Sequence, residues 1–313
     1  IFPPWTSTYS KNKILNCLPP LGVLSIASYV RNQGFSVKVI DVHAEELSPH
    51  EIRKRIRQYR PKYVGISVLT PMIVAAHAIA KLVKEEVPDC TIAFGNVHAE
   101  VDPSRVLRNS AVDLVGMGDG EQIMGELCSG MKFEEIAGIT YLDSTGYIRS
   151  SPNRPVQMNL DVYGMPAYDL IDFDFYHPAV SAYRYLPAAN LMMTRGCPGK
   201  CTFCNSANTV LRSYSPKFIF DQIAELYEKY RIRQLQFYDD TFTINKHGVF
   251  ELCRLINESG MKLSFCCNIR GDCFSDKMAA ALKSAGCHQV LIGIESGSQR
   301  MRKIMGKPIN EKV

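Results

Sequence analysis

The stretch TRGCPGKCTFCNSA holds three cysteines, Cys197, Cys201 and Cys204, in a C-x3-C-x2-C arrangement. A structural zinc site normally closes around four ligands, and the nearest further candidates, His177 and Cys253, are not at finger-like spacing. A ferredoxin would also use four cysteines for its cluster, so an electron carrier fits this spacing poorly. Three thiolates on one loop can hold three irons of a 4Fe–4S cluster and leave the fourth iron open to bind another molecule.

The other cysteines of the chain have the character of core residues. The chain has 11 cysteines, an odd number, and several lie inside apolar runs, namely Cys90, Cys253, Cys266 and Cys287. This distribution, in a chain of 313 residues without a charged-then-apolar leader, is typical of a reducing compartment and not of a disulfide-rich secreted protein. We therefore expect a cytoplasmic protein, and the sequence leaves peripheral membrane association open.

Composition and charge indicate a globular protein that is long enough for two domains. Hydrophobic residues make up 46% of the chain and charged residues 21%, which excludes a disordered chain. The net charge is only +5, and the basic residues are mixed with acids, as in EIRKRIRQYRPK, whose pattern indicates a solvated helix face. We therefore expect no nucleic-acid binding. No uninterrupted apolar run is long enough to predict a membrane-spanning helix.

The first part of the chain alternates between strand-like and helix-like patterns. Short β-branched runs over residues 36–42, 63–69, 90–96 and 112–118 are separated by amphipathic stretches, and the opening Ile-Phe has the character of a strand stub. Buried strands that alternate with helices predict a parallel sheet covered on both faces. We assign residues 1–132 to a Rossmann-like or flavodoxin-like α/β domain, whose ligands bind beyond the carboxyl ends of the strands.

The rest of the chain divides into a connecting segment and a second α/β region. Residues 133–189 contain a predicted hairpin with a Ser-Thr-Gly turn and then a linker rich in Pro, Tyr and Asp. In residues 190–313 the alternation returns, with strands expected over 190–196, 234–242, 262–270 and 288–296. Four successive βα units with polar residues at the strand ends predict a parallel barrel that has its site at those ends.

The cysteine loop in this context resembles the signature of the radical S-adenosylmethionine (SAM) enzymes. The preceding strand, the sequence TRGCP and the aromatic Phe203 directly before Cys204 carry the resemblance. It implies a partial (β/α)6 barrel and a cluster whose open iron chelates the amino and carboxylate groups of SAM. An electron, from a donor such as flavodoxin or ferredoxin, would cleave SAM to a 5′-deoxyadenosyl radical that abstracts hydrogen. The fifth and sixth strands of such a barrel are missing, so we expect a chain truncated at its C-terminus.

Later strand ends are similar to the SAM-binding motifs of that family. The acids of FYDDTF would accept hydrogen bonds from the SAM ammonium, although two solvated acids in a strand-end turn would give the same pattern. The arginine of CCNIRGD could pair with the SAM carboxylate through its fork, while Cys266 and Cys267 beside it fit the core. The glutamate and serine of IGIESGSQ would approach the ribose hydroxyls and the methionine end. The residues implied to contact SAM are Phe203, Asp239, Asp240, Arg270, Glu295 and Ser296.

The first part of the chain extends the resemblance to the cobalamin-binding subfamily of radical SAM enzymes. The matching segments are PPLGVLSIASYVRNQGFSVKVIDV, VGISVLT, AFGNVHAEVDP and GMGDGEQ. Glycines there would allow close backbone approach, and hydroxyl and amide groups would meet the amide side chains of the corrin, although ordinary turns also use glycine. The residues implied to line the cobalamin are Leu21, Gly22, Ser67, Val68, Leu69, Thr70, Gly95, Asn96, His98, Gly118, Asp119 and Glu121.

The segment DVHAEE begins like the D-x-H-x-x-G motif that ligates cobalt through histidine in some cobalamin proteins. Glu46 stands where that motif has glycine, and the segment follows the second predicted strand instead of the first. We therefore interpret His43 as a polar residue at a strand end, and His98 as a contact to the corrin or its tail. Cobalamin is then expected to bind with its lower face not ligated by a protein imidazole.

The resemblance implies an enzyme that methylates an unactivated carbon of a small-molecule, lipid or pigment substrate. Methylcobalamin would donate the methyl group, and a second SAM would remethylate the cobalt, so that two SAM are used for each methyl transferred. One alternative is a cyclase or rearrangement enzyme of the same subfamily, in which cobalamin donates no methyl. Another is a corrinoid-binding module with a structural cluster, which would form no deoxyadenosine.

Overall fold

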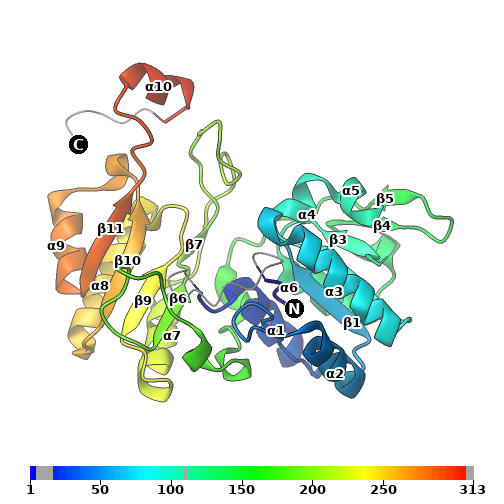
Figure 1. The fold of residues 1–313 in the computed structure, drawn as a ribbon. Helices are drawn as coiled ribbons and strands as arrows, with labels where there is room; N and C mark the ends of the chain where they lie inside the picture. The colour runs from blue at the N-terminus through cyan, green and yellow to red at the C-terminus, as the bar shows by residue number, and fades with distance from the viewer. Residues whose placement is uncertain (5–16, 109–110, 308–313) are drawn as a thin grey trace. The chain divides into compact units, whose positions relative to one another are not determined.

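The computed structural model describes residues 1–4, 17–108 and 111–307, which divide into two compact units. The first unit comprises residues 1–4, 20–156 and 163–175, and the second comprises residues 17–19, 157–162 and 176–307. Both units are α/β structures, as Figure 1 shows, and each is described by itself below.

The first unit is built on a five-stranded sheet of order β1-β2-β3-β4-β5. The first three strands are parallel and the last two are antiparallel to their neighbours. The predicted hairpin is confirmed as β4 and β5, and because β4 pairs with β3 it continues the same sheet. The strands are β1 (Tyr63–Ser67), β2 (Thr91–Gly95), β3 (Leu114–Gly116), β4 (Ile139–Leu142) and β5 (Ile148–Ser150).

Helices cover both faces of this sheet, and the alternation of side chains along the strands explains why. Ile92 and Phe94 of β2 pack into one core cluster with α2 and α3, while Ala93 packs into a second cluster with α6 on the opposite face. The helices are α1 (Leu21–Asn32), α2 (Pro49–Tyr59), α3 (Ile73–Glu86), α4 (Val97–Val101), α5 (Pro103–Leu107) and α6 (Gly120–Cys128). The expected Rossmann-like or flavodoxin-like fold class is thereby confirmed.

The strand predicted over residues 36–42 is not a regular strand in the structure. It pairs with the start of the chain at one parallel bridge, Phe2 to Asp41, where the Phe2 amide donates to the Ile40 carbonyl at 2.9 Å. The next backbone donor in this parallel ladder after Phe2 would be Pro4, which carries no backbone N–H, so the ladder cannot extend past the bridge. The Ser67 amide donates to the Ile1 carbonyl at 3.1 Å, so the opening residues lie between β1 and the extended segment.

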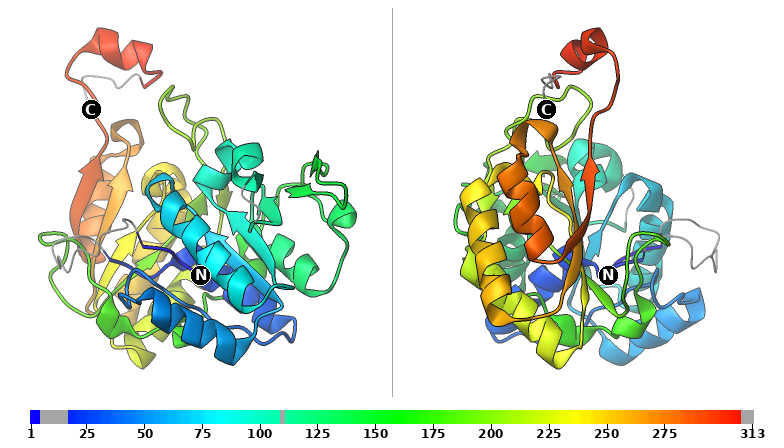
Figure 2. Two further views of the ribbon diagram at one scale, coloured as in Figure 1. Left: turned by 45° about the vertical axis from the view of Figure 1, so that its right-hand side comes forward. Right: turned by 90° about the vertical axis from the view of Figure 1, so that its left-hand side faces the viewer.

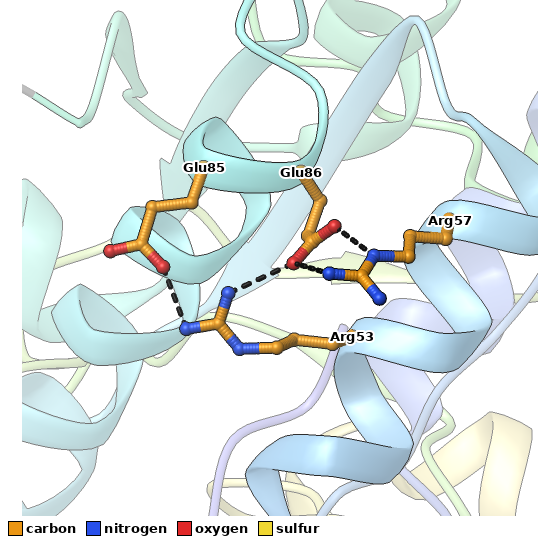
Figure 3. Close-up of polar contacts among 4 residues, drawn as sticks. All are labelled: Arg53, Arg57, Glu85 and Glu86. Carbon is orange, nitrogen blue, oxygen red and sulfur yellow. Dashed lines mark hydrogen bonds and ion pairs between the residues drawn. The ribbon is translucent and has the colours of Figure 1, made fainter.

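A cluster of ion pairs joins α2 to α3 on the surface of the first unit (Figure 3). Arg53 contacts Glu85 at 2.6 Å and Glu86 at 2.9 Å, and Arg57 donates to the same Glu86 carboxylate at 3.0 Å. The two guanidinium groups hold the pKa of Glu86 below its usual range. Two arginines of the basic stretch noted above are therefore engaged with acids of the neighbouring helix.

The second unit is built on a four-stranded parallel sheet of order β11-β10-β9-β6, whose strands alternate with helices. This arrangement confirms the four predicted βα repeats. The strands are β6 (Ala188–Leu191), β9 (Gln234–Phe237), β10 (Ser264–Ile269) and β11 (Cys287–Ile292). The helices are α7 (Pro216–Lys229), α8 (Lys246–Ser259), α9 (Asp276–Ser284) and α10 (Gln299–Ile304), of which α7, α8 and α9 lie side by side along the sheet (Figure 2).

The strand predicted over residues 190–196 is divided in two. β6 ends at Leu191, and β7 (Thr194–Arg195) pairs with β8 (Arg212–Ser213) in a separate antiparallel ribbon. The cysteine loop joins these two short strands. The break occurs because the amides of Met193 and Thr194 are bonded to a side chain instead of a strand, as described below.

The connecting segment between the predicted domains contains the hairpin and several short 3-10 turns. The 3-10 turns of the described residues are Thr70–Met72, Phe133–Glu135, Leu160–Tyr163, Tyr168–Leu170, Phe173–Phe175, Phe242–Ile244 and Gly271–Cys273. The boundaries at 132 and 189 stay predictions, although a division at 132 would separate β4 and β5 from the sheet they join.

None of the helices in the described ranges is both long and apolar enough to cross a membrane.

The aromatic cluster around Phe237 provides a test of the core of the second unit. Phe237 is 2% exposed, and its ring centroid lies 4.4 Å from that of Phe242 and 5.4 Å from that of Phe265. We predict that Phe237→Ala lowers the free energy of unfolding of this unit by about 3–5 kcal/mol, because a cavity replaces the ring. Thermal unfolding followed by calorimetry measures the change.

Phe250→Ala is the matched control, because the Phe250 side chain on α8 is 38% exposed and leaves little cavity. Its expected effect is below about 1 kcal/mol. Equal destabilisation by the two variants would contradict the assignment of Phe237 to the core.

Candidate functional site

The cysteine loop is closed by hydrogen bonds within itself. The Thr209 amide donates to the Cys197 carbonyl at 3.0 Å, and the Asn208 amide donates to the Gly199 carbonyl at 2.7 Å. The Thr209 hydroxyl accepts from the Cys197 amide at 2.8 Å and donates to the Ser206 carbonyl at 2.7 Å. The backbone that carries the first cysteine is thereby fixed from the far side of the loop.

The end of α10 supports the middle of the same loop. The Thr202 amide, next to Cys201, donates to the Met305 carbonyl at 3.0 Å. The three thiols lie at different depths: Cys197 is buried, Cys201 is half-buried and Cys204 is exposed. The loop therefore presents its sulfurs from the protein interior outward to the surface.

The donor set fits an iron–sulfur cluster better than a single metal ion. Within the described part of the chain, no three His, Cys, Asp or Glu side chains are placed so that they could hold one metal ion. An iron–sulfur cluster does not require its ligands to converge on one ion, because each thiolate binds a different iron. Burial raises the pKa of Cys90 to about 11 and that of Cys253 to about 12, which keeps these core cysteines as thiols and supports the assignment of the ligand role to the loop.

Asp239 lies just beyond the end of β9, as predicted, and its side chain is turned into the protein. Its side chain is 1% exposed, and its carboxylate accepts hydrogen bonds from the Thr194 amide and hydroxyl, both at 2.6 Å, and from the Met193 amide at 3.1 Å. Burial raises its pKa to about 6, so the carboxylate is mostly ionised at neutral pH and able to accept from all three donors. Asp239 therefore fixes the start of β7, while Asp240 beside it is exposed, and the contact of either acid to the SAM ammonium stays a prediction.

Arg270 lies at the end of β10, beside the cysteine loop. Its Nε and Nη2 atoms donate to the two carboxylate oxygens of Asp272 at 3.0 and 2.7 Å. Its Nη1 atom lies 2.4 Å from the point where a Cβ at Gly199 would stand. The structure thus brings Arg270 together with the loop, while its role in SAM binding stays a prediction.

The remaining predicted SAM residues are placed less directly. Phe203 is 56% exposed on the loop. Glu295 forms an ion pair with Lys307 at 2.7 Å, which the sequence interpretation did not foresee. The Ser296 hydroxyl accepts from the Ser298 amide at 3.1 Å, and the Ser296 carbonyl accepts from Arg302 at 2.7 Å. Glu295 and Ser296 are therefore held by the segment that includes α10, the helix that also contacts the loop.

In the first unit, polar side chains gather where β1 and β2 end. Because these strands are parallel, their carboxyl ends share one edge of the sheet. The Asn96 amide group donates to the Ser67 hydroxyl at 3.0 Å, and the His98 Nδ1 lies 3.2 Å from the Thr70 hydroxyl. Leu69 beside them is half-buried. These hydroxyl, amide and imidazole groups fit the expected partners of the corrin amides.

The backbone at Asn96 adopts a conformation that is almost confined to glycine, with φ 76° and ψ 170°. Such a residue costs about 1–3 kcal/mol and is typical of binding and catalytic sites. The Asn96 side-chain oxygen accepts from the Val97 amide at 2.7 Å and begins α4. The strain therefore lies at the edge where the ligand is expected.

The predicted cobalamin glycines face open space. A Cβ built at Gly22, Gly95 or Gly118 would meet no heavy atom of the described residues within 4 Å. Gly118 has a φ of +108°, which explains its glycine by backbone conformation, but no positive φ explains Gly22 or Gly95. Packing against the part of the chain that the structure describes does not explain these two glycines either, and close approach of a bulky ligand would. The half-buried Leu21 precedes Gly22 at the start of α1.

Two predicted cobalamin residues have buried side chains. Val68 is fully buried in the core, so only its backbone remains available, and its carbonyl accepts from the His98 amide at 3.2 Å. The Glu121 carboxylate accepts from the buried Ser25 hydroxyl at 2.6 Å. Apolar alternation along β1 turns the Val68 side chain inward, and α1 supplies a donor that holds Glu121 inside, while the contacts of both residues to cobalamin stay predictions.

Other residues near this edge were missed by the sequence interpretation. The Glu100 carboxylate accepts from the Gly118 amide at 3.2 Å, and burial raises the Glu100 pKa. The Tyr163 hydroxyl donates to Asp119 at 2.9 Å. No local pattern marks Glu100 or Tyr163, because their partners are distant in sequence.

His43, which we interpreted as a polar residue at a strand end, is half-buried. Its amide donates to Asp41 at 3.1 Å, in a turn after the extended segment.

Each of the two parts of the chain matches the model of a known protein family. Residues 11–128 match the B12 binding domain, and residues 191–313 match the radical SAM superfamily. An uncharacterized methyltransferase of Pyrococcus horikoshii is 32% identical over 317 residues, covering 99% of this chain and 67% of the relative. Cytidylyl-2-hydroxyethylphosphonate methyltransferase of Streptomyces wedmorensis is 25% identical, covering 97% of this chain and 66% of the relative.

A relative with a different reaction and two solved structures are also similar. Anaerobic magnesium-protoporphyrin IX monomethyl ester cyclase of Rubrivivax gelatinosus is 25% identical, covering 92% of this chain and 54% of the relative. The cobalamin-dependent SAM radical enzyme OxsB has a TM-score of 0.81 at 22% identity, covering 96% of this chain and 45% of that one. The radical SAM methyltransferase TsrM of Kitasatospora setae has a TM-score of 0.77 at 18% identity, covering 94% and 59%.

These two structures share the fold of the chain. The chain spans about two thirds or less of the length of the relatives and about half of the length of the solved chains.

The two adjacent acids of FYDDTF should give opposite results when each is changed to its amide. In Asp239→Asn, the carboxamide nitrogen would face a backbone N–H, so we expect a loss of about 2–3 kcal/mol in unfolding free energy and at least a several-fold loss of bound iron. In Asp240→Asn, iron content and stability should stay at the wild-type level. Iron and sulfide analysis after anaerobic reconstitution, with thermal unfolding, measures both. Full iron content in Asp239→Asn would show that the loop does not depend on this carboxylate.

Proposed function

The chain belongs to the radical SAM enzymes that carry a B12-binding domain, and from this premise we propose that it methylates an unactivated carbon. The observation that carries the proposal is the loop of three cysteines, fixed at the strand ends of the second unit, in a chain whose 32%-identical relative is named a methyltransferase. The proposed substrate is a small molecule, a lipid or a pigment. The proposed reductant is a flavodoxin or a ferredoxin.

The proposed cofactors are a 4Fe–4S cluster, SAM and cobalamin. When bound, SAM at the cluster would supply the radical that takes hydrogen from the substrate, and cobalamin would supply the methyl group. Cys197, Cys201 and Cys204 would hold the cluster, with the first ligand buried and the last exposed. Asp239 would hold the loop in position without touching SAM, because its carboxylate is occupied by backbone and hydroxyl donors.

The polar groups around the loop would bind and orient SAM. The exposed carboxylate of Asp240 would accept hydrogen bonds from the ammonium, and the edge of Arg270 that faces away from Asp272 would hold the carboxylate. Glu295 and Ser296 would approach the ribose, with Lys307 holding the Glu295 side chain. The placement of Arg270 beside the loop and the exposure of Asp240 support these proposed roles.

The polar edge of the first unit would bind the corrin. Ser67, Thr70, Asn96 and His98 would meet its amide side chains, and the open space above Gly95 would admit its bulk. His98 Nδ1 already contacts the Thr70 hydroxyl, which suits a hydrogen-bonding residue. We propose that no imidazole of this chain ligates the cobalt.

A second candidate function is cyclisation or rearrangement without methyl transfer. The observation that favours it is the cyclase of Rubrivivax gelatinosus, which is 25% identical over 92% of this chain. The third candidate, a corrinoid-binding module with a structural cluster, predicts no cleavage of SAM. The three functions therefore differ in what happens to SAM.

Cleavage of SAM separates the enzyme from the binding module. We expect the reconstituted chain, reduced with dithionite, to form 5′-deoxyadenosine from SAM, and Cys201→Ala to lower the rate at least 100-fold because the cluster loses one of its ligands. Cys128→Ala is the control, since Cys128 is half-buried on α6 in the other unit and should leave the rate unchanged. A silent wild type that retains its iron would favour the binding module.

Transfer of label separates methylation from cyclisation. With methyl-labelled SAM and bound, reduced cobalamin, a methyltransferase should place the label on the corrinoid and release S-adenosylhomocysteine in equal amount. Over full turnover the methyltransferase should use two SAM for each methyl transferred. Mass spectrometry of the extracted corrinoid measures the label, and an unlabelled corrinoid beside active SAM cleavage would favour the cyclase.

Gly95→Val tests the cobalamin edge. The new side chain would enter the open space at the end of β2 without meeting protein atoms near its Cβ, so the fold should be kept. We predict at least a tenfold fall in the amount of cobalamin bound per chain, measured by the optical spectrum after gel filtration. The iron content of the same sample serves as the control and should not change. Unchanged cobalamin content would place the corrin elsewhere.

A further inference from the structure

Asp272 accepts two hydrogen bonds from one edge of the Arg270 guanidinium. Arg270 Nε donates to Oδ1 at 3.0 Å and Nη2 donates to Oδ2 at 2.7 Å, which is the bidentate geometry of an arginine–carboxylate pair. The two residues flank Gly271 in the turn after β10. Because a guanidinium is planar, fixing its Nε–Nη2 edge also fixes the direction of its Nη1–Nη2 edge.

The second edge of Arg270 is directed to the cysteine loop. A Cβ at Gly199 would lie 2.4 Å from Arg270 Nη1 and 3.2 Å from Cys197 Sγ. The guanidinium and the buried thiol are therefore close neighbours, and they approach each other where Gly199 has no side chain. The Gly199 amide also donates to Cys197 Sγ at 3.4 Å.

We propose that Asp272 is a positioning residue that aims the Nη1–Nη2 edge of Arg270 at the cluster site, where this edge binds the carboxylate of SAM. Gly199 provides the room for that approach. The inference rests on the proposed function, and it adds the residue that orients the arginine. Without Asp272, the long Arg270 side chain would sample several rotamers, and most of them would turn the fork away from the loop.

The pair contributes little to the stability of the fold. Asp272 is 38% exposed, and ion pairs of such exposure stabilise proteins by only a small amount. A change at Asp272 should therefore alter ligand binding without altering folding. This difference distinguishes a positioning role from a structural one.

The first experiment compares SAM with 5′-methylthioadenosine, which has the nucleoside and sulfur but no amino-acid carboxylate. In Asp272→Ala we expect the Kd for SAM to rise about tenfold, while the Kd for methylthioadenosine, the iron content and the melting temperature stay at wild-type values. Arg270→Lys should raise the Kd for SAM similarly, because the ammonium group of lysine cannot form the bidentate hydrogen bonds of a guanidinium with a carboxylate. Anaerobic equilibrium dialysis of the reconstituted chain measures both ligands.

The double variant Asp272→Ala/Arg270→Lys tests whether the two residues act through one contact. We expect its Kd for SAM to match that of Arg270→Lys alone, because Asp272 acts only through the arginine. Gly199→Ala, whose new methyl group would meet Nη1, should also raise the Kd for SAM. Its iron content is measured beside the Kd, because the same methyl lies near Cys197.

Equal loss of SAM and methylthioadenosine affinity in Asp272→Ala would overturn the inference, as would a fall in iron content or an unchanged Kd for SAM. A multiplicative effect in the double variant would also overturn it. Failure of the wild type to bind SAM at all would instead overturn the proposed function, which keeps the two outcomes distinct.

Discussion

The buried carboxylate of Asp239 is the interaction on which the candidate cluster site depends. It stands two residues beyond the end of β9 and takes hydrogen bonds from Met193 and Thr194, just after the neighbouring β6 ends. Because these amides bond to a side chain, the backbone leaves the parallel sheet and enters the antiparallel ribbon of β7 and β8. In a buried setting such a bond set is strong and directional, so it places the first residues of the loop.

The loop is then held at successive points along its length. Thr209 fixes the backbone of Cys197, the end of α10 meets the backbone beside Cys201, and the Arg270–Asp272 pair lies against Gly199. Thr209 belongs to the loop itself, whereas α10 and the Arg270–Asp272 pair come from segments far from it in the sequence. The cysteine loop is thus positioned by tertiary contacts, although its ligands are adjacent in the chain.

The fold could be predicted from the sequence because its signals are local. The apolar runs of β1, β2, β9 and β10 and the amphipathic helices between them specify a parallel α/β arrangement without knowledge of distant contacts. A regular strand over 36–42 does not form because the partner segment has Pro4 where the next backbone donor would be, and the strand over 190–196 is divided because Asp239 binds two of its amides. In both cases a distant residue decided a local structure.

The candidate ligands stand out in the sequence, whereas the residues that support them do not. The spacing of the cysteines marks the loop, and Arg270 was expected at the same end of the parallel sheet because it follows a predicted strand. Asp239, Val68 and Glu121 have polar or motif positions that suggest ligand contact, but burial assigns them to the protein interior. The strained backbone of Asn96 also bears on the affinity for a ligand. The free energy that this strain costs is already spent when the chain folds, so the edge of the sheet at Asn96 has its shape before a corrin binds. Binding there would then order fewer backbone groups and lose less conformational entropy.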